Sequence, residues 1–200
     1  MIKHIIFDLG NVLVDIHPRE VLQQFSKICS IDYQKIKTFF LSPLHLDFMS
    51  GNYSPDIFYK KMISEFSCNL TQEEFFAIWT KVIGNPKAGV SNLIKKLLNR
   101  YQLSVCSNTD YLHWNVALEK ASFLKNFDYY FLSFEMKINK PNPQIFEQML
   151  RKLNATGENC IFIDDTEENI RQANCFGIKG CCTSQVDEME NFLSRLKILT

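Results

Sequence analysis

Five short apolar runs, each closed by polar residues, constrain the fold of this 200-residue sequence more than any other feature. Short apolar runs of this kind are typical of buried strands. The expected strands cover residues 4–8, 103–107, 129–133, 160–165 and 178–184, and helical patterns cover residues 90–100, 112–121, 144–153 and 167–176. Strands that alternate with helices predict an α/β fold in which a parallel sheet has helices on both faces.

The stretch from about residue 15 to residue 83 breaks this alternation, because it holds helical patterns and no convincing strand. His17-Pro18 opens one pattern, and Ser54-Pro55 supplies a capping serine followed by proline at the first helical position. Residues 71–74 have the spacing of a capping box. We therefore predict a bundle of roughly four helices over residues 16–83, inserted into a core formed by residues 1–15 and 84–200.

Charge and hydropathy exclude several classes of function. Lys+Arg and Asp+Glu each number 22, so the formal net charge is zero, and no basic cluster suits the backbone of a nucleic acid. No apolar run approaches the roughly 18 residues of a membrane span, and Asp8 interrupts the start where a signal peptide stays apolar. We expect a cytoplasmic monomer or homodimer that binds neither nucleic acid nor membrane.

The seven cysteines are scattered, odd in number, and form no Cys-x-x-Cys pair. Such a pattern does not suggest a disulfide framework. We therefore expect reduced thiols, with Cys106 and Cys160 packed as small hydrophobic residues inside apolar runs.

The polar residues that close the strands are candidate site residues, because open α/β sheets bind ligands at the carboxyl ends of their strands. Asp8 precedes Leu9-Gly10, so a carboxylate enters a loop that a ligand can approach closely, although the same pattern also suits a simple turn. Asp164 and Asp165 are adjacent, and a divalent cation would compensate their mutual repulsion. A helix N-terminus would also suit these two acids.

Two further segments carry groups that suit a phosphate. Ser107-Asn108-Thr109 follows the second run and offers hydroxyl and amide donors, or alternatively a helix N-cap. Lys140 lies beside two prolines in a loop between a strand and a helix, which is a rigid place for a cation. A nucleophilic carboxylate, a cation site, hydroxyl donors and an ammonium together match the needs of phosphoryl transfer.

The order of these motifs resembles the haloacid dehalogenase superfamily, and the resemblance spans essentially the whole chain. It implies a Rossmann-like three-layer core with a small inserted helical cap. The sequences DLGN and SNT are most similar to those of glucose-1-phosphatase-like members and of the phosphatase domains of epoxide hydrolases. The segments that carry the resemblance are FDLGNVL at 7–13, FMSGNYSPDIFYKKM at 48–62, VCSNT at 105–109, SFEMKINKPNPQIF at 133–146 and IFIDDTEEN at 161–169.

This resemblance implies a phosphatase in which Asp8 attacks phosphorus and water then hydrolyses the aspartyl-phosphate. It implies Mg2+ as the cofactor, held by Asp8, the Gly10 carbonyl and Asp165, with Asp164 as a further acid and Asn169 orienting the outer shell. The groups implied to bind the phosphoryl group are Ser107, Lys140, Asn108 and the backbone amides of Leu9 and Gly10.

Gly10 departs from the family pattern, because related phosphatases usually carry a second Asp two residues after the nucleophile. General acid–base help from such a group is worth roughly 100- to 10,000-fold. Either the substrate has an acidic leaving group, as in a sugar 1-phosphate or an aryl phosphate, or Asp15 or His17 reaches the site. We expect a Mg2+-dependent phosphatase acting on a small phosphorylated metabolite, with sugar phosphates as the expected class.

Two alternatives remain open at this point. A metal-independent 2-haloacid dehalogenase also uses an Asp nucleophile without the second Asp, but it leaves the acidic pair at 164–165 unexplained. A catalytically weak binding or regulatory protein would leave the combination of Asp8, Ser107 and Lys140 unexplained. In the helical stretch, Trp79 is expected to be a packing residue, with lining of the substrate pocket as the alternative. His45 is expected to lie in a solvated loop, with contact to the substrate as the alternative.

Overall fold

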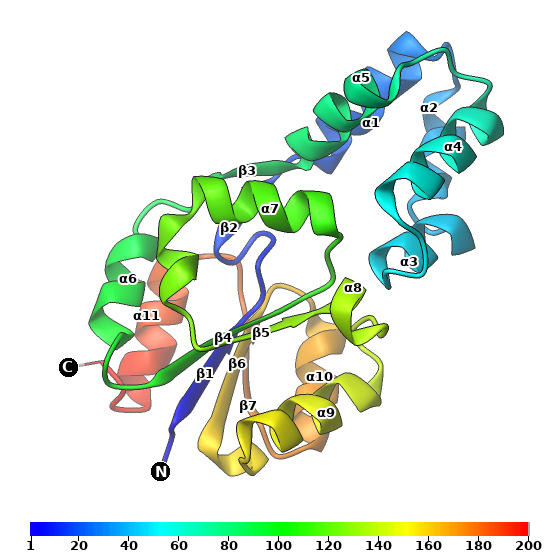
Figure 1. Cartoon of the computed structure of the whole chain (residues 1–200). Helices are drawn as coiled ribbons and strands as arrows, with labels where there is room; N and C mark the ends of the chain where they lie inside the picture. The colour runs from blue at the N-terminus through cyan, green and yellow to red at the C-terminus, as the bar shows by residue number, and fades with distance from the viewer. Residues whose placement is uncertain (200) are drawn as a thin grey trace.

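The computed structural model describes residues 1–199, and five parallel strands form its central sheet in the order β5-β4-β1-β6-β7 (Figure 1). The strands are β1 (His4–Phe7), β4 (Gln102–Ser107), β5 (Tyr129–Leu132), β6 (Cys160–Asp164) and β7 (Lys179–Cys182). All five strands predicted for the core are therefore present. Because β1 lies between β4 and β6, Asp8 opens a loop at the centre of the carboxyl edge.

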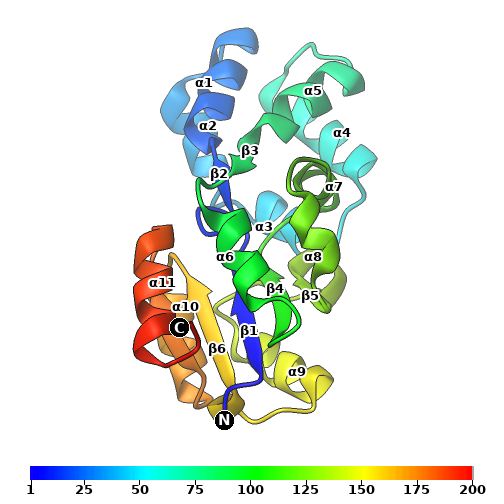
Figure 2. The same cartoon turned by 90° about the vertical axis from the view of Figure 1, so that its left-hand side faces the viewer.

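Helices cover both faces of this sheet, as the alternating pattern predicts (Figures 1 and 2). Ile5 and Phe7 pack into the half of the core that holds α6, α7 and α11, whereas Ile6 packs with α9 and α10. A slip of one residue would exchange these faces, so burial on both sides fixes the register that places Asp8. The bounds are α6 (Val90–Leu97), α7 (Tyr111–Lys120), α9 (Pro143–Leu153), α10 (Glu167–Cys175) and α11 (Val186–Arg195).

Two short antiparallel strands join this core to the inserted helices. They are β2 (Val14–Ile16) and β3 (Ile83–Pro86). The expectation that residues 15–83 contain no strand is therefore wrong at both ends of that stretch. With three and four residues, these strands are too short for an alternating pattern to stand out in the sequence.

Five α-helices, here called the helical segment, lie between β2 and β3 and stand beyond the carboxyl ends of the sheet (Figure 1). Roughly four were expected, and the proline-led starts at Pro18 and Pro55 and the capping box at Thr71 are present. The helices α2 and α3 have only seven residues each, too few for a clear period. The bounds are α1 (Pro18–Ile28), α2 (Tyr33–Phe39), α3 (Pro43–Met49), α4 (Pro55–Phe66) and α5 (Gln72–Trp79).

The helical segment is attached to the core at a second place, beside the short helix α8 (Ser133–Met136). The Ser133 hydroxyl donates to the Met49 carbonyl at 2.6 Å, and the Asn139 side chain donates to the Ser50 hydroxyl. Gly51 has φ +66°, and a Cβ there would lie 2.1 Å from a backbone carbonyl oxygen of α8. Only glycine permits this approach, so the backbones of the segment and the core meet directly.

Cys29, which follows α1, and Cys68, which follows α4, form a disulfide bond. The expectation of reduced thiols is therefore wrong at these two positions. Their sequence separation is 39 residues, and no local pattern specifies such a pairing. Cys106 and Cys160 are free and buried, as expected.

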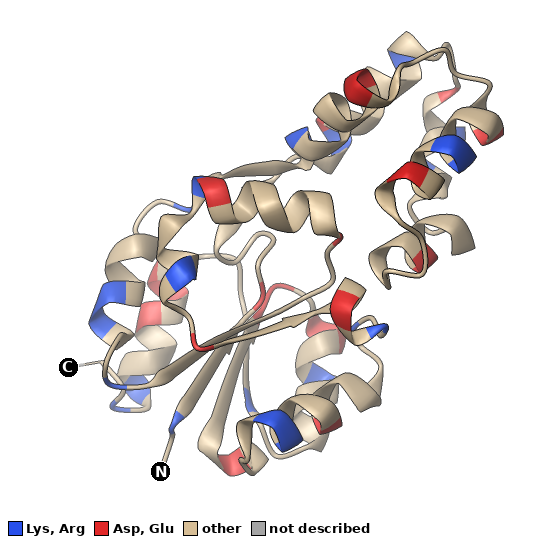
Figure 3. Ribbon diagram, in the orientation of Figure 1, with Lys and Arg blue, Asp and Glu red and all other residues tan. Residues whose placement is uncertain are grey.

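Most charged residues lie on the outer helices of the molecule (Figure 3). No helix within residues 1–199 has both the length and the apolar character needed to cross a membrane. In contrast to these surface charges, Asp8, Asp164 and Asp165 lie together at the carboxyl edge of the sheet.

Candidate active site

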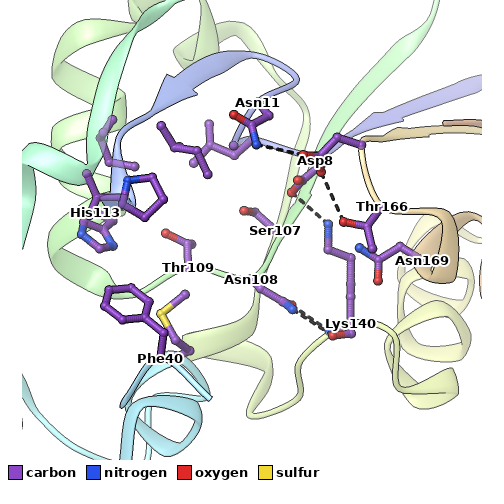
Figure 4. A pocket seen from close by; sticks show the side chains of 18 of the residues that line it. Asp8, Asn11, Phe40, Ser107, Asn108, Thr109, His113, Lys140, Thr166 and Asn169 are labelled. Carbon is purple, nitrogen blue, oxygen red and sulfur yellow. Dashed lines mark hydrogen bonds and ion pairs between the residues drawn. The ribbon is translucent and has the colours of Figure 1, made fainter. Parts of the chain in front are cut away.

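A cavity of about 370 Å³ lies where the carboxyl edge of the sheet faces the helical segment (Figure 4). Its floor contains Asp8 after β1, Ser107 at the end of β4, Lys140 between α8 and α9, and Asp165 after β6. These residues are far apart in sequence, and the parallel strands bring them to one edge. The other predicted site residues that line the cavity are Leu9, Gly10, Asn108 and Asn169.

Lys140 connects two of the acids. Its Nζ atom lies 2.8 Å from Asp8 Oδ1 and 2.6 Å from Asp164 Oδ2, and its side chain is 1% exposed. Burial opposes the ammonium charge, but the two carboxylates outweigh burial and raise the pKa of Lys140 above its ordinary value. The lysine therefore stays charged and offsets the repulsion between the carboxylates.

Asp8 combines burial with access to the cavity. Burial and the nearby Asp164 together raise the pKa of Asp8 to about 6, against the opposing effect of the Lys140 ammonium. Above that pH the carboxylate is ionised, which a nucleophile requires. Its side chain keeps 13% of its surface exposed, so a ligand in the cavity can reach it.

The three acids form a set of oxygen donors that fits a divalent cation. Asp8, Asp164 and Asp165 each offer a carboxylate oxygen, and these atoms all lie within 4.8 Å of one another. The Asn11 amide donates to Asp165 at 2.9 Å, and the Asn169 amide donates to Asp164 at 3.0 Å. Mg2+ prefers oxygen ligands of this kind, and Asn169 holds one of the acids from behind.

Asn108 contacts the backbone of Lys140, a contact that the sequence did not predict. Its side-chain amide donates to the Lys140 carbonyl at 2.9 Å, and its side-chain oxygen accepts from the Lys140 N–H at 2.7 Å. This pair of bonds holds the lysine loop in place and uses one of the two N–H groups of the Asn108 amide, which leaves the other available to a ligand. The Ser107 hydroxyl makes no hydrogen bond within residues 1–199 and points into the cavity (Figure 4).

Neither proposed replacement for the missing acid reaches the site. Asp15 accepts a bond from Lys87 Nζ at 3.1 Å, and His17 lies 3.5 Å from Glu20, while neither residue lines the cavity. Of the two alternatives, this geometry therefore does not favour the one in which Asp15 or His17 replaces the second Asp. Their orientation depends on β2, which the sequence did not reveal.

His113 lines the cavity and was missed by the sequence analysis. Its Nδ1 lies 2.8 Å from Asp110 Oδ2 and its Nε2 lies 2.9 Å from the Trp79 carbonyl, so both nitrogens face acceptors. Burial opposes its charge, but Asp110 outweighs burial and raises the pKa of His113. The ring therefore carries both protons in a buried ion pair. The spacing of a capping Asp three residues before a His was the available signal.

His45 was expected in a solvated loop, yet it belongs to α3, is buried and lines the cavity. Its Nδ1 lies 2.9 Å from the Phe40 carbonyl. Burial lowers the pKa of His45, so at neutral pH the ring is uncharged. The Nδ1–H then donates to Phe40, and Nε2 presents a lone pair that makes no hydrogen bond within residues 1–199.

The fold and the site together define a hydrolase of the haloacid dehalogenase class. Residues 2–177 match the family model described as haloacid dehalogenase-like hydrolase, and the chain belongs to this family. The five-stranded parallel sheet flanked by helices agrees with that assignment.

Three relatives make the assignment more particular. The D-ribitol-5-phosphate phosphatase of Bacteroides thetaiotaomicron is 28% identical over 177 residues, which cover 85% of this chain and 86% of the relative. The sesquiterpene phosphatase astK of Aspergillus oryzae is 24% identical over 189 residues, or 89% and 88% of the two chains. A crystal structure of a haloacid dehalogenase family enzyme from Bacteroides thetaiotaomicron, in complex with magnesium and inorganic phosphate, has a TM-score of 0.81 and 26% identity, covering 90% of this chain and 93% of that one.

Proposed function

We propose that this protein is a Mg2+-dependent phosphatase that hydrolyses phosphomonoesters of small metabolites through an aspartyl-phosphate on Asp8. The observation that carries the proposal is the position of the Asp8 carboxylate, which lies 2.8 Å from the buried Lys140 ammonium at the floor of a cavity. The free Ser107 hydroxyl lines the same cavity. A nucleophile and two donors for phosphate oxygens therefore meet at one place.

The reaction proceeds in two displacements. A carboxylate oxygen of Asp8 forms a bond to phosphorus while the bond to the leaving oxygen breaks, and that oxygen takes a proton from water. A second water then attacks phosphorus, which releases inorganic phosphate and restores the Asp8 carboxylate, and its proton passes to solvent. Ser107 and Lys140 stabilise the charge on the phosphate oxygens.

The acids and the Gly10 carbonyl are the groups that would hold Mg2+ in this site: Asp8, Asp165 and Gly10 directly, with Asp164 behind them. Bound there, the ion supplies positive charge to the phosphate oxygens. The fit rests on the three clustered carboxylates. The relative crystallised with magnesium and phosphate supports the same assignment.

Sugar phosphates remain the class expected from the sequence, and the relative named for D-ribitol 5-phosphate supports this class. The relative named for sesquiterpenes instead supports a hydrocarbon organic part. The two relatives have the phosphate in common and differ in the organic part. The cytoplasmic location also stays a prediction. The Cys29–Cys68 disulfide does not support it, because such bonds are rare in reducing compartments.

The test is phosphate release from a panel of sugar phosphates and aryl phosphates, with Mg2+ and with EDTA, by the wild type and by Asp8→Asn. We expect EDTA to abolish release and Asp8→Asn to lower kcat by about 10,000-fold or more, since it removes the nucleophile. Asp15→Asn is the matched control, because that carboxylate pairs with Lys87 outside the cavity. Release that persists in EDTA or in Asp8→Asn would refute the mechanism. Chloride release from chloroacetate would favour a dehalogenase, and no turnover at all would favour a binding protein.

A further inference from the structure

The cavity has two ends that differ in chemistry. The floor carries the acids, Ser107 and Lys140, whereas the opposite wall is mainly hydrocarbon. Figure 4 shows Phe40 across the cavity from Asp8 and Lys140. The six apolar residues of the wall come from β2, α1, the loop after α2, α3, the short helix η1 (Thr80–Val82) and β3, and they are Ile16, Pro18, Phe40, Met49, Val82 and Ile83.

The polar atoms near this wall are already bonded within the protein. Both nitrogens of His113 face Asp110 and the Trp79 carbonyl. The Asn108 side chain bonds to the backbone of Lys140. The Thr109 hydroxyl donates to the Asp110 carbonyl at 3.4 Å and keeps its lone pairs. His45 Nε2 is also an acceptor, because Nδ1 faces the Phe40 carbonyl. The side chains near the wall can therefore accept from about two hydroxyls.

A substrate with many hydroxyls would bind poorly here. Each hydroxyl taken from water without a new partner costs roughly 5- to 150-fold in affinity. By contrast, each methylene that leaves water against the wall gains roughly 4-fold. Both effects favour a hydrocarbon over a polyhydroxylated organic part, so the organic part of the substrate decides its affinity.

The hydrocarbon surface continues beyond the cavity. Pro18 and Phe40 also border an open hollow beside α1 and α2, together with Leu22 and Leu41. Leu41 is 81% exposed, so its side chain adds apolar surface to this hollow. An apolar chain that extends past Phe40 would therefore meet further apolar surface.

From this geometry we propose that the preferred substrate is a phosphomonoester whose organic part is mainly hydrocarbon and carries at most two hydroxyls, which donate to His45 and Thr109. The proposal rests on the phosphatase function proposed above and specifies its substrate class. Polyol and sugar phosphates are then poor substrates of the same reaction.

The experiment compares pentyl phosphate with D-ribitol 5-phosphate, because both are primary phosphate esters on five carbons and they differ in hydroxyl groups. We expect kcat/KM of the wild type with Mg2+ to be at least tenfold higher for pentyl phosphate. Leaving-group acidity cannot cause this result, since the neighbouring hydroxyl makes the ribitol leaving group the more acidic. A preference for ribitol phosphate would overturn the inference and leave the phosphatase function standing. No phosphate from either ester, nor from an aryl phosphate, would overturn the function itself.

A variant of the wall provides the second readout. Met49→Gln keeps the length of the side chain and adds an amide, so the ratio of kcat/KM for pentyl phosphate over ribitol phosphate should fall about tenfold. Leu46→Gln is the matched control, because Leu46 lies on the same helix α3 and does not line the cavity. Thermal unfolding confirms that each variant is folded. An unchanged ratio in a folded Met49→Gln would contradict the assignment of the wall.

Discussion

The floor of the cavity and its apolar wall are built in different ways. Asp8, Ser107 and Asp165 follow or end parallel strands, and the register of β1 with β4 and β6 fixes where these residues emerge. Half of the wall comes from β2, η1 and β3, and the other half depends on side-chain packing within the helical segment, such as the stacked rings of Phe48 and Phe58 at 3.9 Å. We therefore expect the floor to govern the chemistry and the wall to govern the selectivity. A side-chain substitution in one region should leave the other largely intact.

The strongest test of the floor is Lys140→Met, which removes the ammonium between Asp8 and Asp164. We expect kcat to fall about 1,000-fold, because a preorganised charge at the phosphoryl group is lost. The pKa of Asp8 should also rise above about 6, since Lys140 lowers it in the wild type. The acidic limb of the pH–rate profile would then move to higher pH.

Steady-state kinetics from pH 5 to 9 measure both effects. Lys152→Met is the control, because Lys152 is an exposed lysine on α9. If Lys140→Met stays within tenfold of the wild type and its profile does not move, the proposed role of the lysine is wrong.

A second prediction concerns the ion pair that fastens the wall to the core. His113 on α7 pairs with Asp110 and bonds to the Trp79 carbonyl at the end of α5. Because the folded pKa of His113 is raised above 6.5, its stabilisation is complete below pH 6.5 and is lost as pH rises through the folded value. His113→Asn should lower the free energy of unfolding by about 3 kcal/mol below pH 6.5 and remove this dependence.

Urea unfolding at several pH values measures that free energy. Asp110 contributes in the opposite direction: its pKa is lowered because His113 outweighs burial, so its stabilisation is present above pH 3.8 and is lost as pH falls. His17→Asn is the control, since His17 is partly exposed. Parallel curves for the wild type and His113→Asn would show that the pair does not titrate as described.

The smallest effect is expected at Gly10, where floor and wall meet. Without an acid at this position, wild-type rates with aryl phosphates should rise steeply as the phenol becomes more acidic. Gly10→Asp should flatten that dependence and gain about tenfold with the least acidic phenol. Gly10→Asn is the matched control, because its amide has the same shape and cannot transfer a proton. Either side chain needs a small shift of Ile16, whose Cγ2 would lie 3.3 Å from the new Cβ.

A flat dependence on phenol acidity in the wild type would mean that another group supplies the proton. Pre-steady-state measurement of phenol release separates that step from hydrolysis of the aspartyl-phosphate.

The contrast between floor and wall also explains what the sequence predicted. Apolar runs mark the strands, and the polar residue after each run falls at the same edge, so Asp8, Ser107 and Asp165 were found without coordinates. The orientation of Asp15 depends on β2. The strand that pairs with β2 is β3, which follows the helical segment in the sequence. The burial of His45 at the cavity depends on how the two seven-residue helices α2 and α3 pack. Such contacts join distant residues and leave no local period.

The stretch from Ser133 to Lys140 performs two tasks. Ser133 donates a hydrogen bond to the Met49 carbonyl, and the Asn139 side chain donates one to the Ser50 hydroxyl. The stretch ends at Lys140, whose ammonium lies between two aspartates. A movement of α3 away from α8 would therefore be transmitted along this stretch to Lys140.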